Sequence, residues 1–129
     1  MGHPLIDRLT QEMGWPELAN EHDVHEFTSR PGIHCIFVPG DFKRNLESAD
    51  VAVILPELKM VFQGRFDCAV VADSVEYQVR EAAKILKTPS IIFYREGEMI
   101  GGLPKVRDWD EYVVRINQIL AAPVAAPTE

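Results

Sequence analysis

Three continuous apolar runs stand out along the chain, each bounded by glycine, proline or polar residues. Short runs rich in β-branched and aromatic side chains are typical of strands that are buried on both faces. A second strand follows the last run, because Gly97 in the Glu96-Gly97 pair can adopt the positive φ that a hairpin turn requires. The predicted strands are 33–38, 66–72, 90–94, the partner strand after residue 97, and a short edge strand at 15–18.

Other segments repeat apolar residues at the three- and four-residue spacing of an amphipathic helix. Asp23, Ser74 and Asp108 are the expected N-cap residues of three of these helices. The same spacing places Leu86 and Trp109 on the core side of their helices. The predicted helices are 4–13, 23–29, 48–64, 74–87 and 109–120.

The order of these elements determines the expected fold class. Strands joined by helical crossovers are parallel neighbours, and the terminal hairpin adds an antiparallel part. We therefore predict an α/β fold with a mixed central sheet flanked by helices on both faces. A chain of 129 residues has the size of one domain, which we place at 1–121. The segment 122–129 has no periodicity, and we expect a disordered tail there.

Charge and hydropathy narrow the possible partners and compartments. The chain has 13 Lys and Arg against 20 Asp and Glu, a formal net charge of −7, which argues against nucleic-acid binding. No apolar run approaches the length of a membrane span, so we expect no membrane insertion. The N-terminal segment has no basic region followed by a long apolar one, so we expect no signal peptide and a cytoplasmic protein.

The residues with catalytic or metal-binding chemistry form no motif. Cys35 and Cys68 lie 33 residues apart inside apolar runs, where cysteines usually behave as small hydrophobes. His22 and His25 could share a metal, but no third ligand is near them in sequence. The glycine pair at 101–102 is too short to hold a phosphate and is interpreted as a turn. We expect no enzyme activity, no metal and no cofactor.

The joint spacing of several features resembles the thioredoxin fold over nearly the whole chain. Pro56 lies midway along the helix that follows the first buried strand, and Thr88-Pro89 precedes the hairpin, where thioredoxins have a cis-proline beside the active site. Thioredoxins carry C-x-x-C at the start of the proline-containing helix, whereas the segment 42–50 of this chain has no cysteine. Disulfide exchange requires a thiolate, so this resemblance implies the fold without its redox chemistry.

A narrower resemblance covers most of residues 13–120. It is to the hydrogenase-expression proteins of the HyaE/HupG type, which are thioredoxin-like and lack the redox motif. The resemblance implies a cytoplasmic chaperone for the small subunit of a membrane-bound uptake [NiFe] hydrogenase, which engages the precursor with its twin-arginine signal peptide before export. Other hydrogenase accessory proteins are further candidate partners. The matching segments are Pro39-Gly40-Asp41, Glu47 to Leu58, Gly64-Arg65-Phe66 and Arg107-Asp108-Trp109.

A protein that binds paired arginines and an apolar segment needs carboxylates beside an apolar groove. Asp41, Glu47, Asp50 and Glu57 cluster around the N-terminal half of the proline-containing helix. In thioredoxins this end of the helix and the cis-proline loop form the substrate groove, so we predict that Pro89 lies on the floor of the partner site. The competing interpretation is that these carboxylates only favour a helix N-terminus or solvate a helix face.

Three other possibilities follow from the sequence. A second acidic region, at residues 17–26, could serve the same purpose or form a solvated loop and helix cap. The chain could instead be a thiol-disulfide or peroxidase-type redox enzyme that uses Cys35 or Cys68 as a single reactive thiol. It could also be a structural module that scaffolds a larger maturation complex through its sheet edge or exposed helices.

Overall fold

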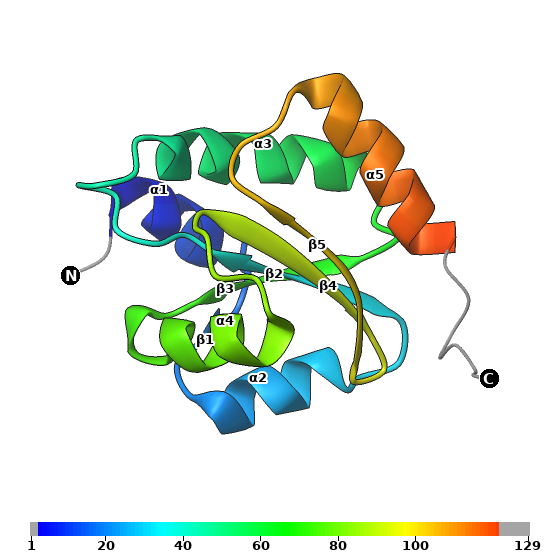
Figure 1. The fold of residues 1–129 in the computed structure, drawn as a ribbon, viewed down its shortest axis with the longest axis horizontal. Coiled ribbons are helices and arrows are strands. Elements are labelled where there is room, and N and C mark those ends of the chain that lie inside the picture. The colour runs from blue at the N-terminus through cyan, green and yellow to red at the C-terminus, as the bar shows by residue number, and fades with distance from the viewer. Residues whose placement is uncertain (1–2, 122–129) are drawn as a thin grey trace.

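The computed structural model describes residues 3–121, and its centre is a five-stranded mixed sheet (Figure 1). The strand order is β1-β3-β2-β4-β5; β1 and β2 both run parallel to β3, while β4 is antiparallel to both β2 and β5. This confirms the predicted mixed sheet. The tail predicted at 122–129 lies outside the described residues. The strands are β1 Glu17–Leu18, β2 Ile33–Val38, β3 Asp67–Val71, β4 Ser90–Arg95 and β5 Glu98–Pro104.

Helices cover both faces of this sheet, as predicted. Figure 1 shows α1, α3 and α5 on one side and α2 and α4 on the other. The helix α1 continues into a π-helical turn at Arg8–Glu12, and α4 is preceded by a 3₁₀ turn at Asp73–Val75. The α-helices are α1 Pro4–Asp7, α2 Glu21–Thr28, α3 Glu47–Val61, α4 Glu76–Ala83 and α5 Trp109–Ala121.

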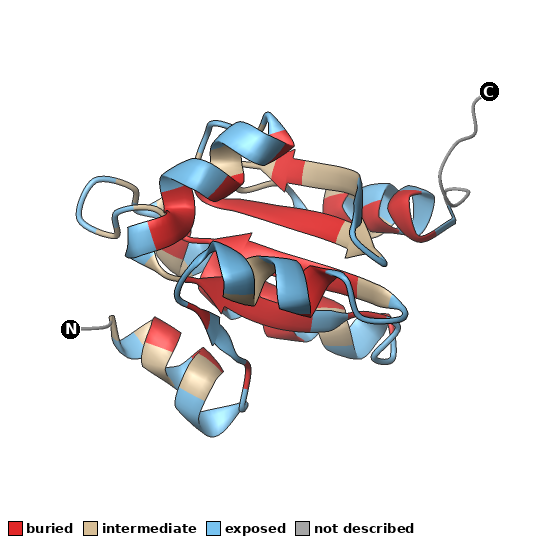
Figure 2. Ribbon diagram, turned by 90° about the horizontal axis from the view of Figure 1, so that it is seen from below, coloured by how far each residue is buried: buried red, intermediate tan, exposed pale blue. Residues whose placement is uncertain are grey.

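The sheet separates two apolar clusters, one on each of its faces (Figure 2). Successive side chains of β2 contribute alternately to the two clusters. Cys35 and Phe37 pack with residues of α1, α3 and α5, while Ile36 and Val38 pack with residues of α2 and α4. Successive side chains of a strand point to opposite faces, so a continuous apolar run is what a strand covered on both sides requires.

The hairpin confirms the predicted turn and shows why β5 contains glycines. Glu96 and Gly97 both have positive φ, at 49° and 91°, as a two-residue type I′ turn requires. Gly101 and Gly102, which we interpreted as a turn, lie inside β5. A Cβ on Gly101 would lie 2.7 Å from Ile119 Cγ1. The interpretation as a turn was wrong because Gly101 makes room for Ile119 of α5, whereas a Cβ on Gly102 would clash with Ile85.

Two of the predicted helix starts differ from those observed. The N-cap of α2 is Asn20, whose Oδ1 accepts a hydrogen bond from Asp23 N at 2.9 Å. Asp23 itself accepts one from Ala19 N. Ser74 does not cap α4, because its Oγ donates to Ala19 O across the fold. The Ser74 hydroxyl therefore forms a tertiary hydrogen bond in place of the helix cap that the local sequence predicted.

Helix α4 also ends earlier than predicted, at Ala83. Lys84 adopts the left-handed conformation, with φ 60°, and its N–H closes the last turn. The helical stripe therefore fails to include Leu86, whose exposed fraction is 57%. Trp109 is likewise exposed, at 41%, although Tyr112 and Ile116 of the same helix are buried. Both residues were predicted to face the core and do not.

The loop between α4 and β4 carries the proline that the fold resemblance singled out. The Thr88-Pro89 peptide bond is cis, and Lys105 N donates to Pro89 O. Pro56 lies inside α3, as predicted. Within residues 3–121, no helix has both the length and the apolar composition that would let it cross a bilayer.

Candidate functional site

The loop between β2 and α3 lies against the loop that carries Pro89. Asn45 Nδ2 donates to Thr88 Oγ1 at 3.2 Å. Gly40 has a φ of 78°, and a Cβ added to it would lie 2.7 Å from the Cβ of Thr88. The structure therefore brings the loop before α3 and the proline loop together.

The first turn of α3 holds a hydroxyl where a redox protein would need a thiol. Ser48 is fully buried, and its Oγ donates to Pro39 O at 2.6 Å. This bond ties the helix to the end of β2. It leaves the hydroxyl committed to the backbone rather than open to a substrate.

Glu47 forms an internal contact at the same end of α3. Its Oε1 accepts a hydrogen bond from Val106 N at 3.0 Å, and its Oε2 lies 3.7 Å from Lys105 Nζ. Lys105 Nζ also donates to Thr88 O. Glu47 therefore connects α3 to the segment between β5 and α5, and this carboxylate is partly occupied within the chain.

Asp41 forms contacts within its own loop, and part of its side chain is accessible to solvent. Its Oδ1 accepts a hydrogen bond from Lys43 N at 2.9 Å, and its Oδ2 lies 3.7 Å from Arg44 Nε. About half of the side chain remains accessible to solvent, at 53%. Asp41 is thus held in place by its own loop while it presents charge to the neighbouring cavity.

Asp50 and Glu57 lie on the outer surface of α3. They are seven residues apart, which places them two helical turns apart on one face. Both residues are exposed, and neither takes part in an ion pair within the described residues. The predicted site thus divides: Asp41, Glu47 and Pro89 belong to the loop region, whereas Asp50 and Glu57 follow the helix into solvent.

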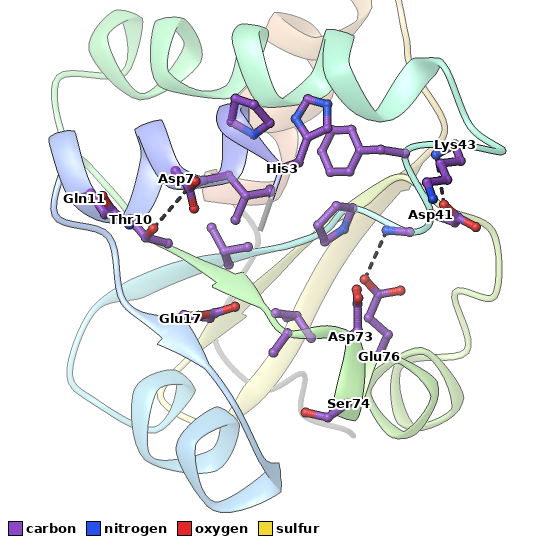
Figure 3. Close-up of a pocket in the computed structure, with 18 residues that line it drawn as sticks. His3, Asp7, Thr10, Gln11, Glu17, Asp41, Lys43, Asp73, Ser74 and Glu76 are labelled. Carbon is purple, nitrogen blue, oxygen red and sulfur yellow. Dashed lines mark hydrogen bonds between the residues drawn. The ribbon is translucent and has the colours of Figure 1, made fainter. Parts of the chain in front are cut away.

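A cavity of about 1070 Å³ opens between the N-terminal helix, the β2–α3 loop and the end of β3. Figure 3 shows polar side chains from these segments around it. Of the five predicted site residues, only Asp41 lines this cavity. One lysine, Lys43, and one histidine, His3, also line it. The carboxylates that line it are Asp7, Glu17, Asp41, Asp73 and Glu76.

Glu76 is the most deeply placed of these carboxylates. It is 9% exposed, and its Oε2 accepts a hydrogen bond from Gly40 N at 3.1 Å. The pKa of Glu76 is raised to about 7, chiefly by burial; the Gly40 N–H and Arg80 lower it, and Asp73 and Asp41 raise it. The cavity therefore contains a carboxyl group that changes its charge near neutral pH.

Sequence reasoning did not identify Glu76, Asp73 or Asp7 as neighbours of Asp41. Glu76 follows a predicted N-cap and has the pattern of an ordinary first-turn acid. Its contact with Gly40 joins residues 36 positions apart, so no local pattern could have revealed it.

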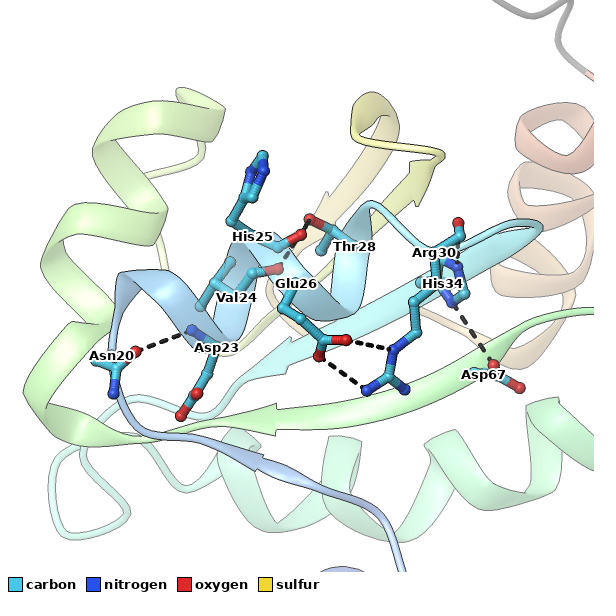
Figure 4. A network of polar contacts seen from close by, with 9 residues as sticks. All are labelled: Asn20, Asp23, Val24, His25, Glu26, Thr28, Arg30, His34 and Asp67. Carbon is cyan, nitrogen blue, oxygen red and sulfur yellow. Dashed lines mark hydrogen bonds and ion pairs between the residues drawn. The ribbon is translucent and has the colours of Figure 1, made fainter.

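The second acidic region also divides between the cavity and a surface network. Glu17 lines the cavity. Glu26 instead forms an ion pair at 2.8 Å with Arg30, which lies just beyond the C-terminal end of α2 (Figure 4). His34 lies beside this helix end, buried, with its Nε2 2.9 Å from Arg30 O and its Nδ1 3.6 Å from Asp67 Oδ2. The network in Figure 4 therefore joins the C-terminal end of α2 to the start of the β2–β3 strand pair.

The two cysteines are neighbours inside the sheet. Cys35 of β2 pairs in register with Cys68 of β3, and both are buried, at 0% and 3% exposure. Burial raises the pKa of the Cys35 thiol, and Cys68 raises it further. A buried thiol with a raised pKa is a poor nucleophile, so the geometry gives no support to a single-cysteine redox site.

Potential metal ligands do not gather in the part of the chain that the structure describes. Within residues 3–121, no three His, Cys, Asp or Glu side chains come together in a way that could hold an ion. His22 and His25 remain a pair on α2.

The sequence is similar to known proteins over most of its length. The sequence profile of the family described as "Hydrogenase-1 expression protein HyaE" matches residues 5–112. The hydrogenase expression/formation protein HupG of Rhodobacter capsulatus is 59% identical over 120 residues, which cover 93% of this chain and 87% of that protein. The protein HoxO of Cupriavidus necator is 32% identical, with 96% and 78% covered.

Solved structures agree with the fold. A crystal structure of a hydrogenase expression/formation protein hupG from Rhodopseudomonas palustris superposes with a TM-score of 0.57 and 34% identity, covering 82% of this chain and 96% of that one. A mutant thioredoxin from Halobacterium salinarum has a TM-score of 0.65 at 13% identity, covering 84% of this chain and 94% of its own. The second likeness concerns the fold alone and confirms the thioredoxin-like architecture.

Proposed function

This chain belongs to the HyaE family of hydrogenase expression proteins, and we propose that it is a non-catalytic chaperone for the small subunit of a membrane-bound uptake [NiFe] hydrogenase. Family membership makes it an accessory protein of hydrogenase maturation. In our proposal it acts in the cytoplasm and binds the small-subunit precursor through a twin-arginine signal peptide before export.

The observation that carries the proposal is the chemistry at the start of α3. Ser48 is buried and bonded to Pro39 O, and both thiols of the chain lie within the sheet. Asn45 contacts Thr88 beside Pro89, which supports our proposal that these two loops form the partner groove. A groove without an accessible nucleophile is suited to recognition.

The charge of the region suits a partner with arginine side chains. A guanidinium binds a carboxylate through two parallel hydrogen bonds, which makes paired arginines strong ligands for clustered acids. Asp50 and Glu57 are exposed on α3, and Asp41 presents an accessible carboxylate at the neighbouring loop. We propose that these three residues contact the partner. Glu47 and Pro89 would then hold the surrounding loops in position.

Titration of the purified protein with the small-subunit precursor tests this function. Isothermal calorimetry should show saturable binding to the full precursor, and binding about tenfold weaker or more to the same subunit without its signal peptide. The precursor with both signal-peptide arginines replaced by glutamine is the matched control. Equal affinity for all three forms would contradict signal-peptide recognition, and the absence of binding to any form would contradict the chaperone function.

A further inference from the structure

Helix α3 is apolar on its outer as well as its inner side. Its buried side packs into the core through residues such as Val51, Leu55 and Leu58. The outward side of a surface helix is normally polar, yet α3 carries exposed apolar residues there, with the sheet on its other side (Figure 1).

Leu46, the N-cap residue of α3, and four exposed residues of the helix follow a regular order, which we call the α3 seam. Leu46, Val53 and Met60 are 82%, 48% and 76% exposed. Asp50 and Glu57 lie between them and are also exposed. The separations along the seam are four, three, four and three residues, which is the spacing of one face of a helix that pairs with another helix.

We infer that the α3 seam is a docking surface for an amphipathic helix of a partner protein that carries lysine or arginine beside its apolar residues. Apolar side chains at every second position of the seam provide contact area, and the acids between them select the partner's charge. In paired helices, polar residues at such positions specify partner and register. The inference deepens the proposed chaperone function and rests on it for the identity of the natural partner.

Charge complementarity distinguishes this occupant from the other candidates. A second copy of the chain would bring Asp50 and Glu57 against the same acids or against apolar side chains, and each copy carries a net charge of −7. The segment 122–129 contains no lysine or arginine. Lys59 is the basic residue nearest to Glu57 along α3, but a two-residue offset places it on a different side of the helix. The seam itself is therefore acidic and apolar.

Synthetic helices test the surface without the natural partner. One peptide of about 20 residues carries leucines at the four-and-three spacing with lysines between them, and its matched control replaces each lysine with glutamate. In an NMR titration of the ¹⁵N-labelled protein, the lysine peptide should shift the amides of residues 46–61 in a saturable manner. We expect the glutamate peptide to bind at least about tenfold more weakly, since two exposed charge pairs change from attractive to repulsive.

Two variants complete the test. D50K/E57K should reverse the preference between the peptides, whereas E21K/E81K, which makes the same change of charge on α2 and α4, should leave it unchanged. V53S/M60S should weaken binding of the lysine peptide and preserve the charge preference. Shifts that map outside α3, no saturable shift, or a D50K/E57K variant that still prefers the lysine peptide would each overturn the inference.

The same variants separate this inference from the proposed function. If the hydrogenase precursor binds the wild-type chain and D50K/E57K equally well, the seam is not its docking surface, and the chaperone function stands. If the precursor does not bind the wild-type chain, the chaperone function fails, while the peptide titration still decides whether the seam binds a basic helix.

Discussion

The backbone N–H of Gly40 donates a hydrogen bond to Glu76 Oε2 at 3.1 Å, joining the end of β2 to the start of α4. Gly40 also lies against Thr88, beside the cis-proline. One loop therefore connects the carboxylate-lined cavity with the loop that carries the cis-proline. A substitution on either side of Gly40 should therefore affect both the cavity and the proline loop.

The pKa of Glu76 predicts a pH dependence of stability. Burial raises the pKa of Glu76 in the folded protein from 4.5 to about 7, so between these values the folded state holds a proton that the unfolded state has released. The free energy of unfolding must then fall as pH rises through this window, by roughly 1–3 kcal/mol in total. Urea unfolding at pH 5, 6, 7 and 8 measures this slope.

Replacing the carboxyl group isolates its contribution from those of the histidines, which titrate in the same range. Glu76→Gln keeps an oxygen that can accept from Gly40 N and cannot ionise, so the slope should flatten and stability at pH 8 should rise. Glu81→Gln, at an exposed position on the same helix, is the control and should retain the wild-type slope. An unchanged slope in Glu76→Gln would show that another group is responsible.

Gly40 should not tolerate a side chain. Its φ of 78° is in the left-handed region, and an added Cβ would meet Thr88. Gly40→Ala should lower the free energy of unfolding by at least about 2 kcal/mol, because the steric cost of the conformation is joined by the displacement of Thr88.

Gly14→Ala provides the matched comparison for that substitution. Gly14 has a similar φ of 74°, but an added Cβ would meet nothing within 4 Å. Its cost should be the conformational term alone, about 1 kcal/mol. Chemical denaturation of both variants measures the difference, and equal losses would show that the contact with Thr88 carries no energy.

Glu47 should stabilise the fold, whereas Glu57 on the same helix should not. Glu47→Ala removes the acceptor for Val106 N and the partner of Lys105. Because the pair is only partly buried, the loss should be about 1 kcal/mol. Glu57→Ala, on the same helix and exposed, should change stability by less than about 0.5 kcal/mol. If the two substitutions have equal effects in urea unfolding, Glu47 has no special structural role.

The two thiols should be unreactive in the folded protein. Cys35 and Cys68 are buried, so a thiol reagent such as DTNB should modify them rapidly only after denaturation. An insulin-reduction assay should show no turnover above background. Rapid labelling of the native protein, or turnover that disappears in Cys35→Ser or Cys68→Ser, would instead support the redox alternative.

Much of the architecture could be predicted because it depends on local periodicity. The run at 33–38 indicated a strand covered on both faces, and in the fold Cys35 and Ile36 face opposite clusters. The Glu96-Gly97 pair predicted the hairpin because its conformation is set within four residues. The predicted cap at Ser74 was wrong because its hydroxyl forms a tertiary contact with Ala19 O. The caps at Asn20 and Lys84 are local and were missed because Asp23 offered a competing N-cap pattern and lysine rarely adopts a positive φ.

The candidate site was predicted less completely. Exposed carboxylates look alike in a sequence, so nothing there separated Glu47, which binds the Lys105 segment, from Asp50 and Glu57, which face solvent. Helical spacing likewise placed Trp109 with Tyr112, although only Tyr112 is buried. The period of a helix defines which residues share a side, but the extent of the covering elements decides how much of that side is buried.

By itself the sequence determined the order of the elements, the mixed sheet, the proline positions and the absence of C-x-x-C, because each of these follows from nearby residues and their spacing. Only the tertiary structure decided that Glu76 contacts Gly40, that Cys35 and Cys68 are register partners on neighbouring strands, and that α3 presents apolar residues to solvent. These properties depend on contacts between segments far apart in the chain. The pKa of Glu76 depends on them most directly, since burial raises it only after the sheet and helices have assembled around the carboxyl group.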